Sequence, residues 1–156
     1  MKAWASISVL LILALGLASC ADTETREQKF ANMQRLADQG DARAQYLLGL
    51  MHEQGYGVTP DIRQAAACFQ KAAAKGEPNA QYRLGFMYYH GQGVPKDLPQ
   101  AAEWYKKAAE QGSTPAQAAL GNLYLSGEGV PKDIAKAAYW HKRSLRLKKP
   151  ADVTRD

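Results

Sequence analysis

The chain repeats itself every 36 residues, as the spacing from Gly49 to Gly85 and from Gly85 to Gly121 shows. Two further sets of glycines recur at the same period: Gly55, Gly91 and Gly127, and Gly57, Gly93 and Gly129. Self-similarity at a period of about 20–50 residues is typical of a solenoid, in which each unit buries its apolar face against its neighbours. The sequence therefore predicts a repeat array whose function lies on a surface.

Each repeat is predicted to contain two helices. In the range 78–89, Ala80 and Leu84 belong to an apolar face with helical spacing, and Gly91 then supplies the left-handed exit that a helix end favours. Asp97 follows as the expected N-cap of the second helix. The sequence thus predicts a pair of helices joined by a glycine-containing turn.

The same pattern extends over most of the chain. It predicts helices at about 25–39, 42–54, 61–75, 78–89, 98–111, 114–126 and 133–147. The predicted fold class is all-α: an α/α solenoid of about three helix-pair repeats, at 44–79, 80–115 and 116–148, with an extra N-terminal helix in a domain spanning 26–148. Gly49, Gly85 and Gly121 fall inside helices, where each costs about 1 kcal/mol relative to alanine. We therefore expect a neighbouring helix to approach the backbone closely at these positions.

The N-terminus predicts export. Lys2 and the apolar run that follows it have the pattern of a signal peptide over 1–19, and the run is too short for a mature membrane span. The sequence Leu17-Ala18-Ser19-Cys20 resembles the lipobox of bacterial lipoproteins, in which cleavage leaves the cysteine lipidated at the new N-terminus. This resemblance implies a short tether at 20–25, a membrane anchor through Cys20 and a location in the bacterial envelope, facing the periplasm on the outer membrane. An ordinary secretory signal with a chance cysteine is the alternative.

The repeat itself resembles a known family. The residues from Ala80 to Gly112 read Ala-Gln-Tyr-x-Leu-Gly, Gly-x-Gly-Val, Pro-Lys-Asp and Ala-Ala-x-Trp-Tyr-Lys-Lys-Ala-Ala-x-x-Gly. This combination is similar to the Sel1-like repeat, a relative of the tetratricopeptide repeat. The resemblance implies a superhelix that serves as a scaffold or adaptor for proteins, and some bacterial relatives are exopolysaccharide-export lipoproteins or immunity proteins against secreted toxins.

The chain offers no arrangement that predicts catalysis. None of the serines Ser113, Ser126 and Ser144 lies in a Gly-x-Ser-x-Gly elbow, and the three histidines stand at different repeat positions without zinc-site spacing. Cys68 is in register with two tryptophans and is expected to be a buried apolar residue. We therefore predict a protein that is not an enzyme and needs no cofactor or metal.

The charge and the aromatic residues do not predict a nucleic-acid partner. The net charge of +5 falls by one when Lys2 is removed, and this mild charge by itself argues neither for nucleic acid nor against it. Four aromatic residues lie among lysines, but we expect them to point inward and form the core: Trp104, Tyr105, Tyr139 and Trp140. An exported lipoprotein would also rarely meet nucleic acid.

Comparison of the repeats separates a constant face of each first helix from a variable one. The variable face changes its chemistry from one repeat to the next and is expected to line the concave side of the solenoid. Its candidate partner-binding residues are Leu47, Leu50, Gln54, Arg83, Phe86, His90, Ala119 and Asn122. Adjacent exposed apolar residues would favour a protein or peptide ligand in this groove. The alternative is that flanking helices cover them.

The C-terminal end is basic. Its cations are Lys142, Arg143, Arg146, Lys148 and Lys149, the last of which begins a tail at 149–156. Basic groups in the last turn complement the helix dipole and help to keep a terminal repeat soluble. A contact with anionic headgroups or with an acidic partner is the second interpretation.

The sequence as a whole predicts a non-catalytic envelope lipoprotein that binds another protein or peptide through its superhelix. Two narrower roles remain open at this point. One is an immunity protein that neutralises a secreted antibacterial toxin, and the other is a structural factor in the export of an envelope polymer.

Overall fold

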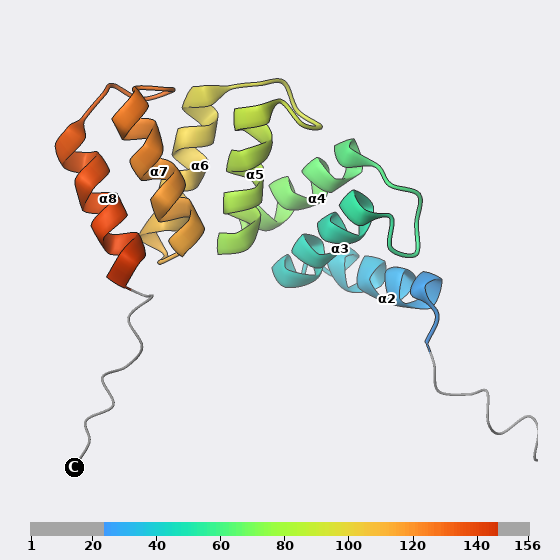
Figure 1. Ribbon diagram of the computed structural model, residues 1–156. Coiled ribbons are helices and arrows are strands. Elements are labelled where there is room, and N and C mark those ends of the chain that lie inside the picture. Colours follow the sequence, from blue (N-terminus) through green and yellow to red (C-terminus); the bar gives the residue numbers. More distant parts are fainter. Residues whose placement is uncertain (1–23, 147–156) are drawn as a thin grey trace, which may run out of the picture.

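A computed structural model describes residues 24–146, which form seven helices of 13 residues each (Figure 1). The helices are α2 (Arg26–Asp38), α3 (Ala42–Gln54), α4 (Ile62–Ala74), α5 (Pro78–His90), α6 (Leu98–Glu110), α7 (Thr114–Ser126) and α8 (Ile134–Arg146). No strand occurs within this part of the chain. The prediction of an all-α solenoid is confirmed. The signal peptide, Cys20, Lys148, Lys149 and the tail lie outside the described residues.

Side-chain caps and glycines set the ends of the helices. Thr25 forms a capping box with Gln28 at the start of α2, and Asp97 accepts a hydrogen bond from the Gln100 backbone N–H at the start of α6, 3.0 Å away. At the other end, Gly91 adopts the left-handed conformation that closes α5, with φ of 71°. Asp97 is thus the N-cap that the sequence predicted.

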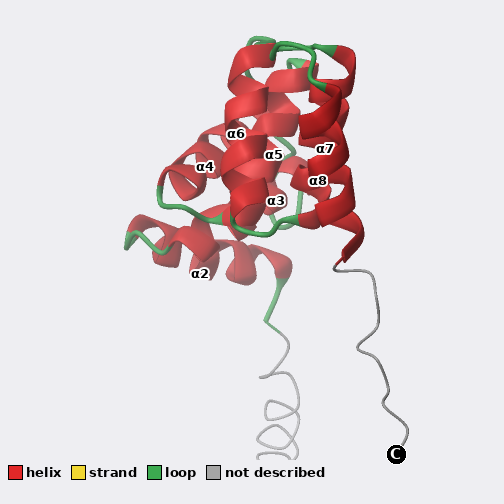
Figure 2. Ribbon diagram, turned by 90° about the vertical axis from the view of Figure 1, so that its left-hand side faces the viewer, coloured by secondary structure: helices red, strands yellow, loops and turns green. Residues whose placement is uncertain are grey.

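The helices stack in chain order, and each packs against the next one along the chain. In Figure 1, the axes of α5 to α8 are roughly aligned, with the chain direction alternating from one helix to the next, whereas α2 and α3 lie across them at the other end of the stack. Figure 2 shows α2 running beneath the upright helices. The stack therefore twists along its length, as a superhelix of helix pairs does.

Small residues let the two helices of a pair approach closely. A Cβ atom added at Gly85 in α5 would lie 2.7 Å from Cδ1 of Tyr105 in α6. Gly49 meets Phe69 in the same way at 2.6 Å, and Gly121 meets the ring of His141 at 2.9 Å. The expected close approach at the three interior glycines is confirmed, and the neighbour in each repeat is a ring from the second helix.

The glycine turn inside each helix pair packs on the first residue of the helix that precedes the pair. Gly93 has a φ of 69°, and a Cβ atom there would lie 2.4 Å from the carbonyl oxygen of Ile62, the first residue of α4. Gly129 packs in the same way on Leu98 at the start of α6, and Gly57 on Arg26 at the start of α2. Helix α2 therefore occupies the place of a second helix, which confirms the unpaired helix expected before the first repeat.

The core consists mainly of alanines and of apolar residues from the constant face of the first helices. Leu84 and Leu120 are almost completely buried, and Cys68 is buried with them as expected. Burial raises the pKa of the Cys68 thiol. This cysteine is therefore a packed apolar residue in a neutral state.

One core prediction is wrong. Tyr105 and Trp140 are buried, but Trp104 is only half-buried and Tyr139 is 54% exposed. In the 36-residue repeat, Tyr139 is equivalent to Glu103, and both side chains are exposed. The repeat position, rather than aromatic character, decides burial here. Within the described residues, no helix has the length and apolar character to cross a membrane.

Candidate functional site

The first helices of the second and third repeats border a hollow, which we call the aromatic groove. It has a volume of about 240 Å³ and is lined by Tyr82, Phe86, Tyr89, His90, Tyr105, Ala119, Asn122, Leu123 and Glu128. Four of the predicted partner-binding residues meet here: Phe86, His90, Ala119 and Asn122. They come from α5 and α7, which the 36-residue repeat places in equivalent positions.

The rim of the aromatic groove is held by a contact between repeats. The hydroxyl of Tyr89 on α5 donates a hydrogen bond to the carboxylate of Glu128, 2.9 Å away, in the turn after α7. This hydrogen bond and the negative charge of Glu128 raise the pKa of Tyr89, so its hydroxyl remains a donor at neutral pH. Ser126 also donates to Glu128, at 3.2 Å. The turn is therefore fixed as one wall of the groove.

Aromatic rings form the other walls. The rings of Phe86 and His90 lie one helical turn apart with centroids separated by 4.2 Å. Tyr82 and Tyr105 pack with centroids 5.7 Å apart at the base of the groove. Burial raises the pKa of Tyr105, so this ring stays uncharged. The arrangement presents ring faces and edges to a ligand, with Asn122 and His90 exposed at the margin.

The other predicted partner-binding residues lie elsewhere. Leu47 lines a separate hollow of about 210 Å³ with Met33 and Leu36 of α2. Leu50 is half-buried and packs on the cluster formed by α4 and Met87. Their apolar surface is thus partly covered by neighbouring helices, which was the alternative left open by the sequence.

Arg83 and Gln54 also lie outside the aromatic groove. The guanidinium of Arg83 pairs with Glu53 of α3 at 3.4 Å, and both side chains are partly buried. Gln54 is exposed at the end of α3. Arg83 therefore joins two neighbouring first helices, a role that its position in the repeat did not reveal.

Several groove residues were missed by sequence reasoning. Tyr82 and Tyr89 flank the variable face rather than belonging to it, and Tyr105 comes from a second helix. Glu128 lies in a turn where the other repeats carry Tyr56 and Gln92. This change of chemistry inside an otherwise constant Gly-x-Gly turn was the available signal.

The groove contains no set of residues suited to a metal. No group of three or more histidine, cysteine, aspartate or glutamate side chains comes together anywhere in residues 24–146. Its chemistry is that of a recognition surface: aromatic area, a carboxylate and amide or imidazole groups at the rim.

The fold and this surface define the chain as a solenoid of helix pairs, and comparison with protein families gives the particular family. The Sel1 repeat model matches residues 42–77, 78–113 and 114–148. The chain therefore belongs to the Sel1 repeat family. Proteins of this family typically mediate protein–protein interaction and are generally not enzymes. A search of curated proteins finds no match.

Solved structures show the same architecture. A protective antigen of uropathogenic Escherichia coli with an SLR fold is 38% identical with a TM-score of 0.78, and the match covers 81% of this chain and 27% of that one. A Sel1 repeat protein from Oxalobacter formigenes is 35% identical with a TM-score of 0.74, covering 80% of this chain and 51% of the other. The chain thus matches about a quarter and about half of the length of these proteins.

Helicobacter pylori cysteine rich protein B shares the fold at 22% identity. Its TM-score is 0.64, and the match covers 80% of this chain and 92% of that protein. Together these structures establish the Sel1 solenoid as the architecture of the chain.

Proposed function

We propose that this protein is an adaptor of the bacterial envelope that binds a peptide segment of another protein in the aromatic groove, without catalysing a reaction. The observation that carries the proposal is the convergence of Phe86 and His90 from α5 with Ala119 and Asn122 from α7 on one hollow. These residues lie on the variable face of the first helices, where successive repeats differ. A surface that varies on a constant scaffold is suited to recognition.

The dimensions of the groove favour a side chain of a protein over a small molecule. Its volume of about 240 Å³ is below the roughly 300–1,000 Å³ of most small-molecule sites. Aromatic walls favour an apolar or aromatic anchor, and the exposed Asn122 amide can hydrogen-bond the backbone that carries it. We therefore expect an extended or helical segment that inserts one large apolar residue between α5 and α7.

The envelope location is part of the proposal. The lipobox-like sequence before Cys20 supports lipidation, and the tether at 20–25 would hold the solenoid beside its membrane. An adaptor held there would bring its partner to the membrane surface. Immunity to a toxin and assembly of an export machine are two ways in which such binding could be used.

The test of the groove is a substitution that blocks it and leaves the core intact. Asn122 is exposed, so Asn122→Arg places a long charged side chain across the groove without removing a buried contact. Proteins cross-linked in intact cells and captured with the parent chain should be lost with Asn122→Arg. Binding of a purified captured partner, measured by calorimetry, should weaken by about 2 kcal/mol or more, which is roughly 30-fold.

The matched control is Gln70→Arg, which adds the same charge at an exposed position on α4. This variant should retain the partner. Equal retention by both variants would remove the groove from the binding surface, and turnover of a substrate by the purified chain would overturn the non-catalytic assignment.

A further inference from the structure

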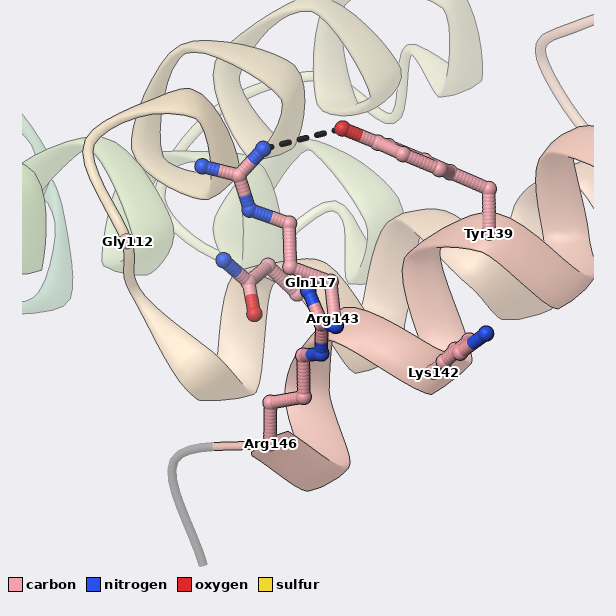
Figure 3. Close-up of a pocket in the computed structure, with 6 residues that line it drawn as sticks. All are labelled: Gly112, Gln117, Tyr139, Lys142, Arg143 and Arg146. Atoms are coloured by element: carbon pink, nitrogen blue, oxygen red, sulfur yellow. Dashed lines mark hydrogen bonds between the residues drawn. The ribbon is translucent and has the colours of Figure 1, made fainter.

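A third hollow lies at the C-terminal end of the solenoid, away from the aromatic groove. It has a volume of about 520 Å³, and we call it the basic groove. Its lining residues are Gly112, Gln117, Tyr139, Lys142, Arg143 and Arg146 (Figure 3). The two grooves share no lining residue. A ligand here would therefore contact different residues from a ligand in the aromatic groove.

The cations of the basic groove are not neutralised by the part of the chain that the structure describes. Within residues 24–146, none of Lys142, Arg143 and Arg146 forms an ion pair. Glu110, which precedes Arg146 by one repeat on α6, is not among the lining residues. With respect to residues 24–146, the cluster therefore presents uncompensated positive charge to solvent, which favours an anionic ligand.

Two of these cations are directed into the hollow. Figure 3 shows Arg143 and Arg146 extending from α8 toward the amide of Gln117, whereas Lys142 points away from it. The Nη1 atom of Arg143 donates a hydrogen bond to the Tyr139 hydroxyl, 2.9 Å away, and its guanidinium lies 5.7 Å from the centre of the Trp140 ring. Arg143 is thus held in place before any ligand arrives, which reduces the entropy lost on binding.

The base of the groove carries a buried hydrogen-bond acceptor. Gln117 is only 1% exposed, and its Nε2 atom donates to the carbonyl oxygen of Ala109 at 3.1 Å. Its Oε1 atom has no hydrogen-bond partner within the described residues. This atom has almost no accessible surface, so a ligand donor reaches it only after a small local shift. A buried acceptor without a partner costs about 1–3 kcal/mol, and this cost favours such a contact.

The preceding repeat shows how such an acceptor is satisfied. There the Nε2 atom of Gln111 donates to Oε1 of Gln81 at 2.8 Å and to the carbonyl oxygen of Gly76 at 3.0 Å. One repeat further on, the residue in register with Gln111 is Leu147, whose side chain has no donor. The last repeat therefore lacks the side-chain donor that serves the repeat before it.

In the first repeat, the residue in register with Gln117 is Gln45. Oε1 of Gln45 also has no partner, but the hollow around it measures only about 90 Å³. That hollow already contains both a carboxylate, Asp38, and a cation, Lys71, which is in register with Arg143. By contrast, the charged residues that line the wide hollow at Gln117 are all cations.

We propose that the basic groove binds an acidic peptide segment of a protein, whose carboxylates pair with Arg143 and Arg146 and whose backbone N–H donates to Oε1 of Gln117. Both the arginine cations and the buried acceptor of Gln117 are needed to identify this class of ligand. A sulfate ion or a phosphodiester would bring only acceptors toward Oε1, whereas a peptide brings donors and carboxylates together. We therefore commit to a peptide, and the vesicle arm of the test below addresses lipid headgroups that carry hydroxyl donors.

The test uses a fluorescein-labelled peptide of alternating glutamate and glycine, with fluorescence anisotropy as the readout. The acidic peptide should bind the full chain, and a peptide of the same length with glutamine for each glutamate should bind at least about tenfold more weakly. Arg143→Gln combined with Arg146→Gln should weaken binding of the acidic peptide by at least about tenfold. Both side chains are exposed, so circular dichroism should show an unchanged fold.

The matched control is Lys106→Gln combined with Lys107→Gln on α6. These lysines precede Lys142 and Arg143 by one repeat, are exposed and carry the same total charge as the arginine pair, but they do not line the groove. This variant should bind the peptide nearly as well as the parent. Equal weakening by both double variants would show general charge attraction and overturn the site.

Two further results would overturn the proposal. One is absence of binding of the acidic peptide at low salt, where charge attraction is strongest. The other is displacement of the peptide by sulfate, or by vesicles of phosphatidylglycerol, at concentrations matched to the peptide carboxylates. That result would assign the groove to anions as such or to a membrane surface. Failure here would leave the test of the aromatic groove unaffected, because Asn122 lies outside this site.

Discussion

Gly85 shows how a single residue sets the distance between two helices. A methyl group at this position would lie 2.7 Å and 2.9 Å from two ring carbons of Tyr105, and 3.2 Å from the Ala101 carbonyl oxygen. Alanine would gain about 1 kcal/mol of helix propensity over glycine, whereas overpacking typically costs about 1–3 kcal/mol. We expect the steric cost to prevail, so Gly85→Ala should lower the melting temperature by about 4 °C or more in a thermal scan.

Gln92→Ala provides the control, because Gln92 is exposed in the turn that follows α5. It should leave the melting temperature nearly unchanged. Replacing the ring as well, in a Gly85→Ala and Tyr105→Leu double variant, should cost less than the sum of the two single changes. Additive costs would show that the two residues are not coupled, contrary to the geometry described above.

Single residues also mark the limit of what the sequence could predict. The repeat register identified Gly85 as a close-contact site, because three glycines inside helices require a common steric reason. It could not reveal that Arg83 pairs with Glu53, because neither residue recurs in the other repeats. Tyr139 was misassigned to the core because it was grouped with the inward repeat positions, although it is in register with the exposed Glu103.

Among the helices, α2 should be the least protected. Only Ala37 is buried in α2, whereas α6 buries five residues: Ala101, Ala102, Tyr105, Ala108 and Ala109. In a solenoid each helix is stabilised chiefly by its neighbours, so a terminal helix with one buried residue should open more often. Hydrogen exchange followed by mass spectrometry should show faster exchange in peptides from 26–38 than in peptides from 98–110.

Equal protection of the two helices would contradict this expectation. It would mean that α2 opens only when the whole domain unfolds, as in a single cooperative unit.

Asp133 offers a check on the other end of the domain, since its side chain accepts a hydrogen bond from the Lys136 backbone N–H at 2.9 Å and caps α8. Loss of this cap in Asp133→Ala should speed exchange in α8 and leave α4 unchanged.

The sequence predicted the helix bounds well, but it predicted only some of the residues that line the aromatic groove. Asp97 and Gly91 mark a helix start and a helix end through local chemistry, so the helix bounds could be predicted to within about one or two residues. The aromatic groove also requires Glu128 to reach Tyr89 from the following repeat. A contact between side chains so far apart in the sequence leaves no periodic signal.

For the molecule as a whole, the proposed anchor makes a direct prediction. Helix α2 begins at Arg26, so a tether over 20–25 spans at most about 20 Å at 3.3–3.6 Å per residue. If Cys20 carries the lipid, Cys20→Ala should move the protein from the membrane fraction to the soluble fraction of the envelope. Fractionation followed by immunoblotting measures this shift.

Cys68→Ala is the matched control, because this second cysteine is buried in the solenoid and should not contribute to anchoring. The variant should remain with the membrane. If Cys20→Ala also remains there, the lipobox interpretation fails or another part of the chain suffices as an anchor. Removal of the basic side chains of 142–149 would then separate these two explanations.

The packing of Gly57, Gly93 and Gly129 on the first residues of α2, α4 and α6 has a consequence for how the array can change in length. Each of these glycines packs on a residue at the same distance back along the chain. One whole repeat can therefore be added or removed without altering any of these contacts. A single inserted residue, in contrast, would disturb all contacts across the insertion. A duplicated copy of 78–113 would find its matching surfaces on both sides. Growth of such a molecule is therefore stepwise, and each step would move the proposed membrane tether and the basic groove farther apart while leaving both unchanged.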